Sequence, residues 1–301
     1  MRIGINSATA TRGDLPGMIA DARTAADEGF ATFWIAQIFG LDALTAIAVA
    51  GREVTGIEFG TAVVPIQPRH PQMLAAQALT TQAAIEDRLA LGIGVSHRIV
   101  VEDMWGYSFA RPATHMREYL EALLPLLAGE SVSISGELVT CHGAVTVRNA
   151  SPPPVLLAGL GPVMLELAGR MGDGTITWCT GPNTLENHIV PGLEEAAEKA
   201  GKPAPRVVAS LPVCVTDDVA GTRARIAGAL QVYGSLPSYR AMLDKEGVDG
   251  PADLAILGSE EQVRDGVASL ADAGVTDFSA AEMARTDDER ARTRGVLRSL
   301  L

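Results

Sequence analysis

The chain has 301 residues, 47% of them apolar, and a formal net charge of −12 at pH 7. This apolar fraction allows a large buried core, and the scattered basic residues exclude a clustered binding surface for duplex nucleic acid. Three cysteines (Cys141, Cys179 and Cys214) without a CxxC pair favour a reducing compartment. The chain shows neither a secretory-signal run nor an apolar run near the roughly 20 residues of a membrane span. We therefore expect a cytoplasmic protein with neither a nucleic-acid nor a membrane partner.

The positions of lysine and histidine argue against two kinds of chemistry. The only lysines are Lys199, Lys202 and Lys245, and none of them ends an apolar strand. Schiff-base catalysis needs an amine desolvated in a pocket, so this chemistry is not expected. His115 and Glu118 are spaced to share one helix face, but no third ligand lies nearby, so we expect no metal site.

Short apolar runs alternate with helical patterns along the chain. Strands are expected at residues 2–6, 32–36, 57–64, 88–94, 152–159, 174–179, 206–215 and 275–280. Helices are expected at residues 14–29, 41–53, 70–86, 112–128, 162–171, 184–200, 218–232 and 259–274. Alternating strands and helices predict a parallel sheet, and eight such units predict an α/β fold that closes into a (β/α)8 TIM barrel. The competing arrangement, two doubly wound halves, is less favoured because no shift in composition divides the chain.

Two segments interrupt this alternation. Residues 131–148, "VSISGELVTCHGAVTV" and its flanks, alternate apolar and polar residues around glycines, which predicts a half-exposed β-hairpin. A polar segment spans about 234–252, and the stretch "YGSLPSYRAML" lies at its start. We expect one domain over residues 1–301, with insertions near 131–150 and 234–252.

The stretch "VLLAGLGPVMLELAGRMGDGTITW" (155–178) resembles half of a dinucleotide-binding turn. The G-x-G-x-x-G fingerprint needs a third glycine and an acidic residue about 20 positions later. Met164 stands at the third position, and the following strand ends in Trp178 and Cys179, so a dinucleotide site is not expected. Gly159 and Gly161 still precede a helix whose amino end favours a phosphate. The alternative is that both glycines only form a tight turn.

Four segments together resemble the luciferase-like monooxygenase superfamily, in its branch that uses the deazaflavin coenzyme F420. They are "FGTAVVPIQPRHP" (59–71), "RLALGIGVSH" (88–97), "AGLGPVMLELAGRMGDG" (158–174) and the hairpin insertion at 131–148. Their order covers nearly the whole chain. The resemblance implies a (β/α)8 barrel of the bacterial-luciferase type that binds a flavin-like ring at the carboxyl ends of its strands.

The resemblance also implies the residues of the site. A non-proline cis peptide is expected between Ala62 and Val63 behind the ring, and backbone N–H groups of the glycine loop are expected to bind the coenzyme phosphate. The full set of expected coenzyme-binding residues is Gln37, Thr61, Ala62, Val63, Gly94, Val95, Ser96, His97, Gly159, Leu160, Gly161, Thr177 and Trp178. The chain departs from the family at Val64-Pro65, where a polar residue is common, and at His97, where an acidic residue is common.

The function implied is an oxidoreductase that transfers a hydride between coenzyme F420 and a small organic substrate such as an enone, an imine or an alcohol/carbonyl pair. His97, Tyr233 and Tyr239 are candidates for a proton donor. Two alternatives stay open: an FMN-dependent luciferase-like monooxygenase, and a non-catalytic barrel that binds a flavin or deazaflavin. The family commonly dimerises around the Ala-rich helix "MLAAQALTTQAA" (73–84), so a homodimer is expected; the alternative is that this helix only packs on its own barrel.

Overall fold

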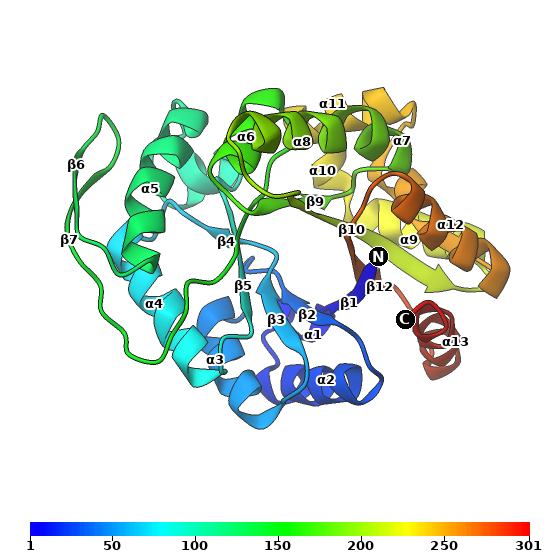
Figure 1. Cartoon of the computed structure of the whole chain (residues 1–301). Coiled ribbons are helices and arrows are strands. Elements are labelled where there is room, and N and C mark those ends of the chain that lie inside the picture. Colours follow the sequence, from blue (N-terminus) through cyan, green and yellow to red (C-terminus); the bar gives the residue numbers. More distant parts are fainter.

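Parallel strands close into a barrel that is surrounded by helices (Figure 1). The computed structural model describes residues 1–301. Around the barrel the strands are β1 (Arg2–Asn6), β2 (Thr32–Ile35), β3 (Glu58–Thr61) continued by β4 (Val64–Pro65), β5 (Leu89–Gly94), β8 (Val155–Leu157), β9 (Gly174–Trp178), β10 (Arg206–Val215) and β12 (Asp277–Glu282). Pairing of β12 with β1 closes the ring, and β11 (Ile256–Gly258) adds to the second half of β10. The predicted (β/α)8 barrel is therefore confirmed.

The predicted helices are present with small changes at their ends. They are α2 (Leu15–Asp27), α3 (Ala43–Glu53), α4 (Pro71–Ala84), α5 (Pro112–Leu127), α6 (Pro162–Arg170), α8 (Val190–Lys199), α9 (Val219–Ala229) and α12 (Glu260–Asp272). Their starts follow local chemistry: Asp14 accepts the N–H of Gly17 at 2.9 Å, and Pro71 occupies the first turn of α4. None of the helices combines the length and the apolar composition that a membrane crossing requires.

The insertions differ in kind. The predicted hairpin is confirmed as β6 (Val132–Ser135) and β7 (Thr140–Gly143), which stand outside the ring beside α4 and α5 (Figure 1). The polar insertion near 234–252 is largely helical, with α10 (Gln231–Ser235), α11 (Pro237–Glu246) and the 3-10 turn η3 (Pro251–Leu254). Further short segments are α1 (Ala8–Thr11), α7 (Pro182–Thr184) and the π-helical η1 (Ile99–Met104) and η2 (Leu185–Ile189).

The structure adds two details to the strands and helices predicted from the local pattern. The helix at 259–274 is not the last, because α13 (Asp287–Arg298) follows β12. The predicted strand 57–64 is broken into β3 and β4, because the backbone bulges between Thr61 and Val64.

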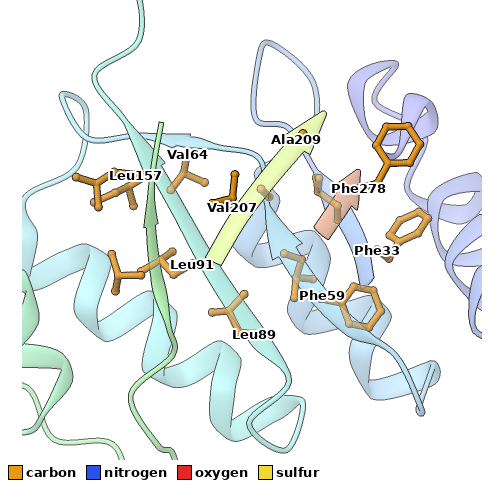
Figure 2. Packing of buried hydrophobic residues seen from close by; sticks show 14 of the residues in the cluster. Phe33, Phe59, Val64, Leu89, Leu91, Leu157, Val207, Ala209 and Phe278 are labelled. Atoms are coloured by element: carbon orange, nitrogen blue, oxygen red, sulfur yellow. The ribbon is translucent and has the colours of Figure 1, made fainter. Parts of the chain in front are cut away.

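Side chains alternate between two layers along each strand, as the period of two requires. One set packs outward against the helices; Figure 2 shows Phe33, Phe59, Leu91, Leu157 and Phe278 among them. The other set fills the barrel interior, where Trp34, Ala90, Leu156, Ile176 and Val208 form a separate cluster. The indole of Trp34 is fully buried, and a Cβ at Gly60 would lie 2.3 Å from it.

Charged residues close the amino end of the barrel below Trp34. Arg206 Nη2 lies 2.7 Å from Asp277 Oδ1 and 3.0 Å from Glu58 Oε2, and its guanidinium carbon lies 5.9 Å from the centroid of the Trp34 ring. Because this end is filled by ion pairs and an indole, a ligand has access to the barrel from the carboxyl ends of the strands, where TIM barrels carry their sites.

Candidate functional site at the carboxyl end of the barrel

A bulge after β3 forms one wall of the mouth. The peptide between Ala62 and Val63 is cis, as the family resemblance implied. The Thr61 hydroxyl is fully buried, accepting the N–H of Gly92 at 2.8 Å and donating to the Gly92 carbonyl at 2.7 Å. The side chain thus replaces strand pairing at the bulge, and Thr61 shapes this wall from behind without offering a free polar atom.

Small residues on β5 and β8 make the bulge possible. A Cβ at Gly94 would lie 2.9 Å from Cγ2 of Val63 and 3.1 Å from the Ala158 methyl. At Gly92 a Cβ would lie 2.0 Å from the Thr61 carbonyl oxygen. Val63 and Ala158 pack against the cluster around Trp34 and are only partly buried, so they form an apolar floor at the mouth.

Four aromatic side chains gather above the mouth. The ring centroids of Tyr233 and Tyr239 lie 5.0 Å apart. The centroid of the His97 ring lies 6.0 Å from that of Tyr233 and 5.8 Å from that of Tyr239. The ring of Trp178 meets that of Tyr233 edge to face, with 6.3 Å between the two ring centroids. The structure therefore brings the three predicted proton-donor candidates together, and α10 and α11 supply two of them from the insertion.

Burial sets the protonation of this aromatic cluster of His97, Trp178, Tyr233 and Tyr239. It lowers the pKa of His97 below its usual 6.5 and raises the pKa of both tyrosines. At neutral pH the cluster therefore holds a neutral imidazole and two protonated hydroxyls.

An ion pair limits what Gln37 can do. Its Oε1 accepts the N–H of Ala43 at 3.1 Å and Nη2 of Arg69 at 3.0 Å, and Arg69 also pairs with Asp42. The Gln37 backbone N–H donates to the Val63 carbonyl at 3.3 Å. The amide oxygen is thus occupied, and the amide nitrogen is the part of this side chain that can meet a ligand.

Asn6 and two serines form a polar set that the sequence reasoning missed. Asn6 Nδ2 donates to Oγ of Ser210 at 3.0 Å and of Ser279 at 3.3 Å, while Ser210 donates to the Ser279 carbonyl at 2.9 Å. This pattern fixes which way the amide faces. All three residues alternate with outward apolar residues on β1, β10 and β12, so counting inward positions would have found them.

The glycine loop before α6 has unpaired donors. The N–H groups of Gly159, Leu160 and Gly161 form no hydrogen bond to the backbone, and neither glycine adopts a positive φ. A Cβ at Gly161 would meet nothing within 4 Å, whereas one at Gly159 would lie 3.1 Å from Cβ of Met164. The left-handed backbone that usually requires glycine in a tight turn is absent here, which argues against the turn-only alternative.

The remaining predicted residues differ in exposure. Val95 is half-buried, and its carbonyl accepts from Gln67 at 2.6 Å. Ser96 adopts φ 56°, directly after β5, a conformation that is uncommon outside glycine and clusters at functional sites. Thr177 is buried, and its hydroxyl donates to the Val208 carbonyl at 3.5 Å. Because successive side chains of a strand point to opposite faces, Thr177 and Trp178 lie on opposite faces of β9.

Glu118 lies outside the candidate site and binds the β6–β7 hairpin. Its buried carboxylate accepts the N–H groups of Leu138 at 2.8 Å and Val139 at 3.0 Å, which fastens the hairpin to α5. No group of three or more His, Cys, Asp or Glu side chains is placed to hold a metal ion.

These features define a (β/α)8 barrel with a candidate ligand site at the carboxyl ends of its strands. Residues 1–277 match the family model of the luciferase-like monooxygenases, and the chain belongs to this family of oxidoreductases.

The proteins that this chain resembles include one named as a putative coenzyme F420-dependent oxidoreductase, from Mycobacterium tuberculosis, which is 28% identical over 270 residues that cover 85% of this chain and 77% of that protein. A 5,10-methylenetetrahydromethanopterin reductase from Methanolobus tindarius is 28% identical over 239 residues, which cover 79% of this chain and 72% of that protein. The structure of a coenzyme F420-dependent tetrahydromethanopterin reductase from Methanopyrus kandleri superposes with a TM-score of 0.82 at 22% identity, covering 98% and 97% of the two chains. An FMN complex of the oxygenating constituent of 3,6-diketocamphane monooxygenase from Pseudomonas putida superposes with a TM-score of 0.78 at 18% identity, covering 99% and 96%.

Proposed function

We propose that this protein transfers a hydride between coenzyme F420 and a small, neutral organic substrate. The observation that carries the proposal is the apolar floor of Val63, Gly94 and Ala158, which lies at the same mouth as the unpaired N–H groups of the glycine loop. A planar ring and a phosphate are complementary to these two features. The similarity to proteins named as F420-dependent favours a deazaflavin over a flavin.

The residues present fit this coenzyme. Ala62 and Val63 would hold the ring, and the N–H groups of Gly159, Leu160 and Gly161 would hold the phosphate. The amino end of α6 adds a favourable dipole. When bound, the deazaflavin would donate or accept the hydride, and the protein contributes position and electrostatics.

The aromatic cluster has two roles in the proposal. It excludes water above the floor, and it presents hydroxyl and imidazole groups that have no charge at neutral pH. Tyr233 and Tyr239 stay protonated because burial raises their pKa, so either hydroxyl is able to hydrogen-bond or protonate a substrate oxygen or nitrogen. Arg69, which donates to Gln37, pairs with Asp42. This pairing leaves no free counter-charge there, which favours a neutral substrate.

The test incubates the full chain anaerobically with reduced F420 and a panel of neutral enones, imines and ketones. Oxidation of the coenzyme is monitored by the increase in the absorbance of its oxidised form. Substrate-dependent oxidation with at least one neutral compound supports the proposal. Carboxylated analogues of the best compound serve as matched controls and are expected to react more slowly. Tight binding of F420 without turnover of any compound would favour the non-catalytic alternative.

An FMN-dependent monooxygenase is the second candidate, because a structural neighbour of this fold holds FMN. Oxygen consumption with reduced FMN, coupled to the disappearance of an organic substrate, would support it. The same assay with reduced F420 is expected to show no oxygen consumption, because deazaflavin has carbon in place of N5.

We also propose a homodimer through α4. Met73 on this helix is 54% exposed, and the small, partly exposed Ala76 lies about one turn away, where it permits close packing. Sedimentation equilibrium tests this, with Met73→Glu expected to shift a wild-type dimer to monomer; a monomeric wild type would overturn it.

A further inference from the structure

His188 contacts the glycine loop from a neighbouring element. It lies on η2, and its Nε2 is 2.9 Å from the carbonyl oxygen of Leu160. A carbonyl oxygen only accepts, so Nε2 carries the hydrogen in this contact. His188 is half-buried and comes 27 residues after Gly161 in the chain, so local sequence around the loop gives no sign of it.

This hydrogen bond fixes the direction of the next donor. The Leu160–Gly161 peptide is trans, since the cis bond of the chain lies at Ala62–Val63. In a trans peptide the C=O and the following N–H point in opposite directions. When His188 holds the Leu160 carbonyl, the N–H of Gly161 is therefore directed away from η2, and it has no partner within the chain.

Two features around the Gly161 N–H make it available and important as a donor. Pro162 starts α6 and has no N–H, so the first turn of the helix lacks one of its usual free donors. A Cβ at Gly161 would meet no atom within 4 Å, so there is open space beside this peptide.

Close helix packing holds His188 in place. At Gly169 in α6, a Cβ would lie 2.4 Å from the Leu193 carbonyl oxygen and 2.8 Å from the Ala196 methyl of α8. The two helices therefore approach closely, and η2 runs directly into α8. The position of His188 relative to the loop is set by this packing.

We propose that His188 is a positioning residue of the coenzyme phosphate site: its ring N–H orients the Leu160–Gly161 peptide so that the Gly161 N–H donates to the phosphate. The inference rests on the proposed function, but it holds for either phosphorylated coenzyme. It predicts that His188 affects binding of the phosphate and has little effect on binding of the ring.

The experiment measures dissociation constants of the full-length protein by fluorescence titration. The probes are F420 and its phosphate-free deazaflavin riboside, together with FMN and riboflavin. The variants are His188→Leu, which removes the donor, and His188→Gln, whose amide donates over a similar reach. Asn187→Leu, at an exposed neighbouring position on η2, is the matched control.

His188→Leu is expected to weaken the phosphorylated coenzyme roughly tenfold, equivalent to about 1.4 kcal/mol, and to leave the phosphate-free form unchanged. His188→Gln is expected to recover most of this loss, and Asn187→Leu to show none. The inference alone is overturned if the wild type binds a phosphorylated coenzyme and His188→Leu weakens the binding of the phosphorylated and phosphate-free forms equally. It is also overturned if His188→Leu weakens the binding of neither form. If the wild type binds neither phosphorylated coenzyme, the proposed function is overturned together with it.

Discussion

Val63 and Gly94 meet so closely across the bulge that a Cβ at position 94 would lie 2.9 Å from Cγ2 of Val63. Glycine at 94 is therefore a condition for the position of Val63, and hence for the apolar floor of the mouth. Neither the Val63 side chain nor the neighbouring Ala158 methyl at 3.1 Å is flexible enough to move aside.

Gly94→Ala is expected to displace the bulge and weaken coenzyme binding. Overpacking of this kind costs about 1–3 kcal/mol, and part of it should appear as at least a tenfold higher dissociation constant. Gly228→Ala is the matched control, because a Cβ there meets nothing within 4 Å. Equal affinities of the two variants would show that the floor does not depend on Gly94.

Thr61→Val keeps the shape of the side chain but removes both hydrogen bonds to Gly92. Two buried backbone groups would then lose their partner, at roughly 1–3 kcal/mol for each. Urea unfolding is expected to show a lower midpoint for this variant. Thr55→Val, at an exposed position between α3 and β3, should leave the midpoint nearly unchanged, and a similar small effect at Thr61 would contradict the role of its hydroxyl.

The tyrosines of the aromatic cluster are expected to separate chemistry from binding. If Tyr233 or Tyr239 protonates the substrate, the corresponding Tyr→Phe variant should lower kcat by about 100-fold with little change in coenzyme affinity. Tyr107→Phe is the control, since Tyr107 is 49% exposed and outside the cluster. Full activity in both single variants and in the double variant would exclude the two hydroxyls and leave His97.

His97 should make the protein less stable in acid. Its pKa in the folded chain is below the usual 6.5 because of burial, so the unfolded chain takes up the proton first as the pH falls. The free energy of unfolding contributed at this position is unaffected above pH 6.5 and decreases below it, towards the lower folded pKa. Denaturation of wild type and His97→Phe at pH 7.5 and 5.0 tests this: the variant should lose less stability, and equal losses would contradict the argument.

Most of the barrel could be predicted because each strand and helix has a strong local signal. The missed elements have weak ones: β11 is three residues long, and α13 is highly polar. For α13 a signal did exist, since Thr286 and Glu289 form a capping box. The break in β3 follows from long-range contacts of Thr61 and Val63 with β5, which no local pattern contains.

The site was partly predictable for the same reason. The residues at 94–97 and 159–161 follow strands, and in a barrel the carboxyl ends of strands meet at one face. The contact of His188 with Leu160 depends on a partner far away in the sequence, so only the folded chain shows it. Strand alternation places Asn6, Ser210 and Ser279 inside the barrel, but their hydrogen bonds to one another also appear only in the folded chain.

The most direct test of the central claim is an equilibrium titration of the purified full-length chain with F420 and, separately, with FMN. The account predicts saturable binding of F420 at micromolar concentration and clearly weaker binding of FMN. Tight FMN binding with no saturable response to F420 would contradict it.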